Sequence, residues 1–120
     1  MDFADWLRDG RLKAVTPDPG QVRDLLESAE SDISAARELA DLGRFGIGRD
    51  AAYEAMLKCG LALMLSKGYR PETGSHHVTI VRFTEGVLGQ GSEDLIASFD
   101  RLRRTRHQRL YQGKDKATRS

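Results

Sequence analysis

The sequence predicts an all-α fold, an antiparallel four-helix bundle with an extra short helix at its N-terminus. Three observations predict it. Apolar residues recur at three-and-four spacing in several segments, short stretches rich in glycine or proline separate these segments, and the single stretch rich in β-branched residues has no second strand to pair with. At 120 residues we expect one domain, covering residues 1–112, and a charged, disordered tail over residues 113–120.

The first two helices are separated by two prolines. Phe3, Trp6, Leu7 and Leu12 predict a short amphipathic opening helix, which segment 16–20 (TPDPG) ends because proline donates no helical hydrogen bond. A second helix is predicted from about Gln21, with Gly43 as the residue that ends it. Its apolar residues keep helical spacing over about five turns; they are Val22, Leu25, Leu26, Ala29, Ile33, Ala36 and Ala40.

A third helix is predicted from about Arg49 to Lys67, where Gly68 can end it. Its second half is apolar almost all round, which is typical of a central, buried helix. For residues 76–88 strand and helix compete, and we favour helix, with Ser75 as a candidate N-cap.

The last helix is predicted to open at Ser92, whose hydroxyl can cap it, and to carry an apolar face of Leu95, Phe99 and Leu102. On a helical wheel Arg106 lies within that face. A buried arginine needs a partner, so Arg106 is expected either to form an ion pair with Asp50 or Glu54 or to contact a phosphate.

Net charge and cysteine content limit the classes of protein to which the chain can belong. The formal net charge is +1, but the segment from Arg101 onwards contains a run of basic residues and only one acid, Asp115. This run is either a solvated helix face or a phosphate-binding stripe. The single cysteine, Cys59, predicts a buried thiol in a reducing compartment. We expect a cytoplasmic protein, because neither a signal peptide nor a membrane span is visible.

Five pieces of sequence, in this order, resemble the HEPN-domain family. They are residues 29–39 (AESDISAAREL), 49–56 (RDAAYEAM), 63–71 (LMLSKGYRP), a histidine at His76 or His77, and residues 102–111 (LRRTRHQRLY). The resemblance extends from Leu26 to Tyr111. HEPN domains are small helical bundles found with or beside minimal nucleotidyltransferases and in toxin–antitoxin pairs.

The resemblance implies a homodimer whose last core helices form a shared polar cleft. In nuclease members the cleft contains an arginine followed, after four to six intervening residues, by a histidine, and the pair cleaves RNA without metal. If Arg106 is that arginine, Tyr111 stands where the histidine should be, and tyrosine is a poor proton shuttle at neutral pH. Arg101 with His107 meets the spacing, but Arg101 lies on the opposite face of the helix from Arg106.

The predicted function is therefore a dimeric nucleotide-, RNA- or partner-binding module that works with a nucleotidyltransferase or a toxin–antitoxin partner. The predicted binding residues are Arg103, Arg106, His107, Tyr111, Tyr53 and His77. The alternatives are a metal-independent ribonuclease using His107 with Arg106 or Arg101, and a scaffold without a nucleotide ligand. No cofactor is expected, and two adjacent histidines do not make a recognisable zinc site.

Overall fold

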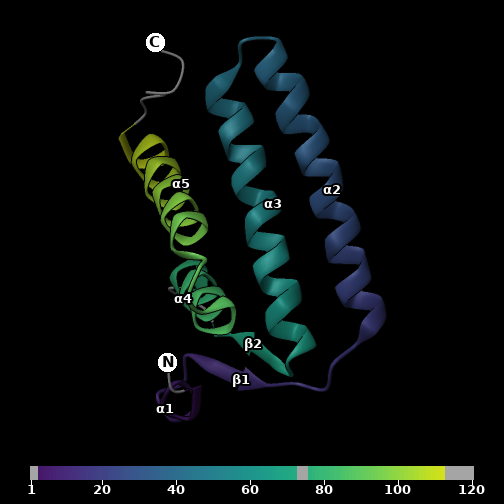
Figure 1. Ribbon diagram of the computed structural model, residues 1–120, viewed down its shortest axis with the longest axis vertical. Coiled ribbons are helices and arrows are strands. Elements are labelled where there is room, and N and C mark those ends of the chain that lie inside the picture. Colours follow the sequence, from purple (N-terminus) through teal and green to yellow (C-terminus); the bar gives the residue numbers. More distant parts are fainter. Residues whose placement is uncertain (1–2, 73–75, 113–120) are drawn as a thin grey trace.

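The computed structural model describes residues 3–72 and 76–112, in which five helices and two short strands follow one another (Figure 1). In chain order they are α1 (Phe3–Arg8), β1 (Leu12–Ala14), α2 (Pro19–Asp41), α3 (Phe45–Ser66), β2 (Tyr69–Pro71), α4 (His76–Leu88) and α5 (Glu93–Gln112). The predicted helical bundle is confirmed. The predicted tail and the candidate cap Ser75 lie outside the described residues.

The two longest helices, α2 and α3, form an antiparallel hairpin (Figure 1). Asp18 caps α2 by accepting hydrogen bonds from the backbone N–H groups of Gly20 (3.0 Å) and Gln21 (3.3 Å). The helix therefore begins at Pro19, two residues before the predicted start, because proline is well suited to the first turn. Gly43, with φ of 74°, forms the turn after α2 as predicted.

Helix α3 begins at Phe45, four residues before the predicted Arg49. The segment includes Gly46 and Gly48, which are weak helix formers, but packing against α2 stabilises this first turn. Gly48 lies close to α2, since an added Cβ would sit 3.4 Å from the Ala36 carbonyl oxygen. Tertiary contact has outweighed local propensity here.

The two strands correct the predicted opening helix. Leu12, assigned to that helix, lies in β1, and the antiparallel pair aligns it with Pro71 of β2. Helix α1 ends at Arg8, and Gly10, with φ of 76°, turns the chain into the strand. Because β1 precedes α2 and β2 follows α3, the pair ties together the two ends of the hairpin. Leu12 is 1% exposed and belongs to the core.

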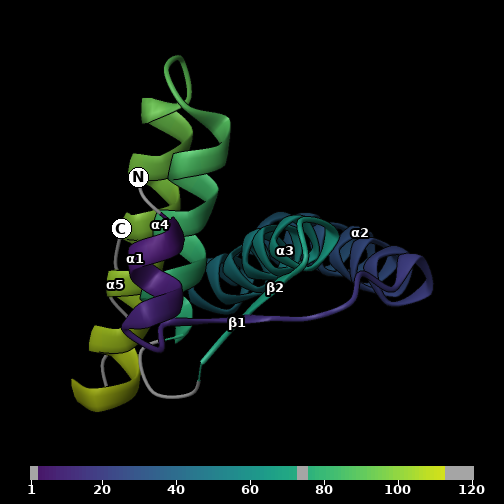
Figure 2. The ribbon, with the colours of Figure 1, turned by 90° about the horizontal axis from the view of Figure 1, so that it is seen from below.

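The core lies on the side of α3 that faces α4 and α5 (Figure 2). Figure 2 also shows that α2 lies on the other side of α3. The predicted helix over residues 76–88 is confirmed. The buried core residues are Leu12, Tyr53, Met64, Ile80, Val81, Phe83, Ile96 and Phe99. Within the described part of the chain, no helix is long and apolar enough to cross a membrane.

Two details of α5 differ from expectation. Leu95 is 51% exposed, and the neighbouring Ile96 packs into the core in its place beside Phe99. The Ser92 hydroxyl donates a hydrogen bond to the Gly89 carbonyl (2.6 Å) and does not cap the first N–H groups of the helix. At the start of α5 the residue that faces the core is therefore Ile96, one position after the predicted Leu95, and Ser92 holds the preceding turn.

Candidate functional site

Four side chains from α3, α4 and α5 meet in a polar group that we call the Arg106 cluster: Tyr53, Glu54, His77 and Arg106. Arg106 Nη1 donates a hydrogen bond to Glu54 Oε1 over 2.6 Å, which identifies Glu54 as the ion-pair partner of Arg106. The guanidinium carbon also lies 5.6 Å from the centre of the Tyr53 ring, within the range of a cation–π contact. Arg106 is thus bound to α3 by charge and by an aromatic face.

Tyr53 links the core to the cluster. It is 1% exposed, its ring contacts Phe99, and its hydroxyl is hydrogen-bonded to His77 Nδ1 over 2.9 Å. Burial is the largest cause that raises the pKa of Tyr53 to about 12, while the positive charges of Arg103 and Arg106 act against it. The hydroxyl therefore remains protonated and can donate to His77.

His77 is kept in its neutral form by its surroundings. Burial lowers the pKa of His77, and the neighbouring His76 and Arg106 lower it further. The rings of His76 and His77 meet edge to face with centroids 4.4 Å apart. A neutral His77 can accept a hydrogen bond from Tyr53 at Nδ1.

A second charged group surrounds Asp100 on α5. Arg103 Nε lies 3.1 Å from Asp100 Oδ1, while Arg104 Nη2 and Arg82 Nη2 lie 3.4 and 3.5 Å from Oδ2. The basic run on α5 is therefore partly neutralised by an acid of the same helix. Arg103 is near enough to Tyr53 for its charge to act on the pKa of that hydroxyl.

The other residues of the predicted arginine–histidine motif lie elsewhere along α5. Both His107 and Arg101 are exposed on α5. Tyr111 lies in the last turn of α5, and its side chain is outside the described part of the structure. Among the described residues, His76 and His77 have no group of further ligands that could complete a metal site.

Comparison with protein families decides the identity of the fold. A model of the HEPN domain matches residues 22–120. The chain belongs to the HEPN family. No curated protein and no solved structure matches it significantly. Glu54, Tyr53 and Arg106 all lie in the matched part of this HEPN domain, whereas α1 and β1 precede it.

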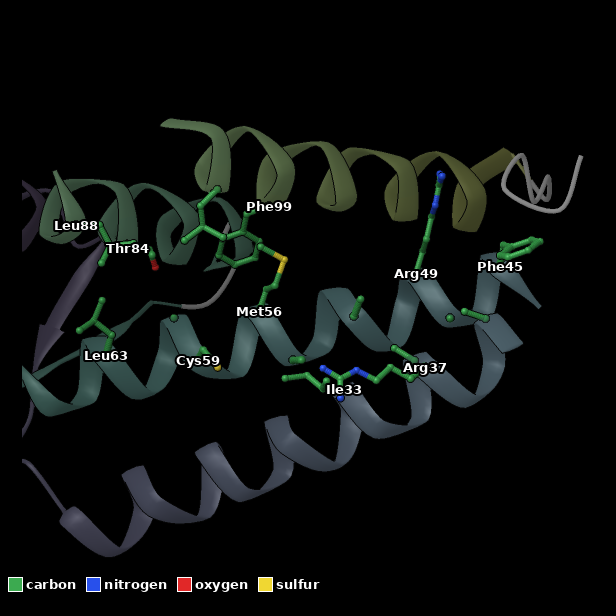
Figure 3. A pocket seen from close by; sticks show the side chains of 17 residues that line it. Ile33, Arg37, Phe45, Arg49, Met56, Cys59, Leu63, Thr84, Leu88 and Phe99 are labelled. Atoms are coloured by element: carbon green, nitrogen blue, oxygen red, sulfur yellow. The ribbon is translucent and has the colours of Figure 1, made fainter. Parts of the chain in front are cut away.

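This HEPN domain also has a groove of about 930 Å³ that sequence analysis missed (Figure 3). Helix α3 forms its floor, and α2 and the α4–α5 pair form its walls. The lining residues are Ile33, Ala36, Arg37, Ala40, Phe45, Gly48, Arg49, Ala52, Ala55, Met56, Cys59, Gly60, Leu63, Thr84, Leu88, Leu95 and Phe99. None of the Arg106 cluster is among them.

Cys59 corrects one prediction. It lines this groove and is exposed, whereas the apolar run around it had predicted a buried thiol. The run is apolar all round, but α4 and α5 cover only one side of α3. Desolvation by its apolar neighbours nevertheless raises the pKa of the Cys59 thiol. The spacing of Phe45, Ala52, Cys59 and Leu63 along one helix face was the signal that could have revealed the groove.

Proposed function

We propose that this HEPN domain is a cytoplasmic homodimer that binds a phosphate-bearing ligand, a nucleotide or RNA, with Arg106 as the contacting arginine. The observation that carries the proposal is the Arg106 cluster, which joins three predicted binding residues, Tyr53, His77 and Arg106. A nucleotidyltransferase or a toxin–antitoxin partner suits the same proposal, because the family resemblance implies such partners.

The geometry of Arg106 supports this role. Its side chain is 28% exposed, and Nη1 is the atom bonded to Glu54. A guanidinium carries five N–H donors in a planar fork, so it can contact phosphate oxygens while it stays paired on one side. Tyr53 and Glu54 restrict the arginine before a ligand arrives, which lowers the entropy lost on binding.

The neutral ring of His77 supports a nucleotide in preference to a bare phosphate. His77 is half-buried at the start of α4, close enough to Arg106 for the charge of that arginine to lower its pKa. Partly exposed aromatic and histidine rings stack on bases in single-stranded RNA sites. A phosphate contact beside such a ring is the combination expected for a nucleotide unit.

Binding of a fluorescently labelled single-stranded RNA and of a labelled nucleotide, measured by anisotropy, tests the proposal. Arg106→Ala should weaken binding at least about 10-fold, since hydrogen bonds to charged groups contribute about 1.5–3 kcal/mol. Arg101→Ala is the matched control, because Arg101 is an exposed arginine of the same helix outside the cluster. Equal affinities for the wild type and Arg106→Ala would contradict the proposal.

The same samples discriminate the alternatives. RNA cleavage that persists in the presence of a chelator and is lost in His107→Ala would favour the ribonuclease over the binding module. A dimer that binds neither RNA nor nucleotide, but binds a nucleotidyltransferase through α5, would show that the domain is a protein-binding module instead of a nucleotide-binding one.

A further inference from the structure

We infer that Tyr53 is a positioning residue that holds His77 with its ring proton on Nε2, from which His77 donates a hydrogen bond to a phosphate oxygen of the ligand. The phosphate is that of the proposed function, on which this inference rests, whereas the position of the ring proton is a property of the free protein. Arg106 thus shares the phosphate with a second, uncharged donor.

The buried hydroxyl of Tyr53 has one hydrogen-bond acceptor within reach. Tyr53 is 1% exposed, so this hydroxyl is shielded from water. Within the described residues it is hydrogen-bonded to His77 Nδ1 alone. If Nδ1 carried a proton, the hydroxyl would accept that hydrogen bond and its own proton would have no acceptor, which is unfavourable for a buried group. The hydroxyl is therefore the donor of this bond, and Nδ1 is the acceptor.

The direction of this bond decides which nitrogen of His77 carries the ring proton. A neutral imidazole has one N–H donor, and its other nitrogen is an acceptor. Because Nδ1 accepts from Tyr53, the proton of the neutral ring lies on Nε2. Burial, together with the charges of His76 and Arg106, lowers the pKa of His77 and so favours this neutral form. Tyr53 thus selects one of the two neutral tautomers.

The Nε2–H group of His77 is not used within the described part of the chain. No described residue accepts a hydrogen bond from Nε2, whereas Nδ1 is bonded to Tyr53. His77 is half-buried, so a ligand can reach part of its ring. The bond at Nδ1 also restricts the orientation of the ring before a ligand arrives, which lowers the entropy lost on binding. Nε2–H is therefore a pre-oriented donor that a ligand can occupy.

Arg106 and His77 both lie close to the ring of Tyr53. The guanidinium carbon of Arg106 is 5.6 Å from the centre of that ring, and the centre of the His77 ring is 5.7 Å from it. Arg106 supplies positive charge, and the neutral N–H of His77 adds a directional hydrogen bond, so the two donors complement each other on one phosphate. Since this N–H lies on the edge of the ring, the face of the ring stays available for a base.

The tautomer is measured by NMR on the full-length protein with isotope-labelled histidine. Long-range proton–nitrogen correlation spectra identify the protonated ring nitrogen, and the spectrum of His77→Asn assigns the signals of His77 among the three histidines. At a pH well above the usual histidine pKa of about 6.5, the wild type should carry the proton on Nε2. Tyr53→Phe keeps the aromatic ring but removes the donor, so it should shift the Nδ1 signal and admit a share of the other tautomer. A wild type with the proton on Nδ1, or unchanged nitrogen signals in Tyr53→Phe, would overturn the inference.

Binding of labelled single-stranded RNA, measured by anisotropy, tests the donor itself. His77→Asn removes Nε2 and should weaken binding at least about 10-fold, the loss expected for one hydrogen bond to a charged group. His77→Gln should restore part of this loss, because its longer side chain carries an amide N–H near the position of Nε2. Neither variant has a ring, so the difference between them reports the donor and not base stacking. Tyr53→Phe should weaken binding less than His77→Asn, since some rings still carry the proton on Nε2.

The two proposals fail in different ways. Equal affinities for His77→Asn and His77→Gln would overturn the donor role of His77, and the proposed function would stand as long as Arg106→Ala weakens binding. A wild type that binds neither RNA nor nucleotide would contradict the proposed function and the donor role together, while the NMR measurement would still decide the role of Tyr53. Circular dichroism of each variant confirms that a loss of binding is not a loss of folding.

Discussion

The two sides of α3 differ in how completely the chain covers them. Toward α4 and α5, Met64 and Phe83 are 0% exposed and Tyr53 is 1% exposed. Toward the groove, Phe45 is 42% exposed and Cys59 reaches the surface. Both sides are equally apolar in sequence, so the difference lies in what packs against each. The chain thus completes its core on one side of α3 and leaves an apolar groove on the other.

The largest expected effect comes from truncating an aromatic ring on each side. Phe83→Ala should lower the free energy of unfolding by about 3–5 kcal/mol, because it leaves a cavity in a fully buried site. Phe45→Ala should cost far less when the protein is dilute, since its ring is 42% exposed. Urea denaturation measures both, and equal losses would contradict the one-sided core.

Adding a methyl group at two glycines of α3, one packed against α4 and α5 and one against α2, gives a smaller contrast. A Cβ at Gly60 would lie 2.6 Å from Ile80 Cγ2 and 2.9 Å from Thr84 Oγ1. Gly60→Ala should therefore destabilise the fold by about 1–3 kcal/mol through overpacking. At Gly48 the nearest atom is 3.4 Å away, so Gly48→Ala should be neutral or slightly stabilising. Thermal denaturation measures both effects. A larger loss of stability in Gly48→Ala than in Gly60→Ala would contradict this expectation.

The hairpin itself depends on a polar clamp between its helices. Lys58 Nζ donates to Asp32 Oδ2 and to Ser28 Oγ, each over 2.7 Å, with Lys58 and Asp32 about a quarter exposed. Lys58→Met keeps the apolar stem and should cost roughly 1.5 kcal/mol, the low end for hydrogen bonds to charged groups. Lys13→Met, at an exposed lysine of β1, is the control in chemical denaturation. If Lys58→Met lowers the free energy of unfolding no more than Lys13→Met does, the clamp is dispensable for stability.

The smallest effect should appear in the pH dependence of stability. The pKa of His77 is lowered in the folded chain, so the unfolded chain takes up a proton first as the pH falls. The stability contributed by neutral His77 is complete above about pH 6.5, the usual histidine pKa, and is lost as the pH falls below it. His77→Gln should flatten the fall in melting temperature between pH 7 and 5. Identical slopes in the wild type and His77→Gln would contradict this.

Much of the fold follows from helical spacing and from turn residues, but three features do not. Strands of three residues, such as the one containing Leu12, are too short to show a period. The rotation of α5 that buries Ile96 and exposes Leu95 depends on how the helix packs against the core. The exposure of Cys59 depends on the side of α3 against which α4 packs. The local sequence pattern does not predict that side.

The candidate site was predictable in part. A charged side chain such as Arg106 in an apolar stripe needs an ion-pair partner. Glu54 was one of the two carboxylates predicted for that role. Tyr53 and His77 were each candidates, but their hydrogen bond joins residues 24 positions apart across a loop. Only the packing of α4 against α3 brings those two side chains together. The Asp100 group was missed because the acid lies beside a run of arginines that was interpreted either as a solvated face or as a phosphate-binding stripe.

Removing the carboxylate that pairs with Arg106 tests its phosphate-binding role most directly. Glu54→Gln should raise the affinity for labelled RNA several-fold and steepen its salt dependence, because the guanidinium charge is no longer neutralised. The double variant Glu54→Gln/Arg106→Ala should lose this gain, with circular dichroism as the check on folding. An unchanged or weaker affinity for Glu54→Gln would contradict the claim that Arg106 contacts phosphate.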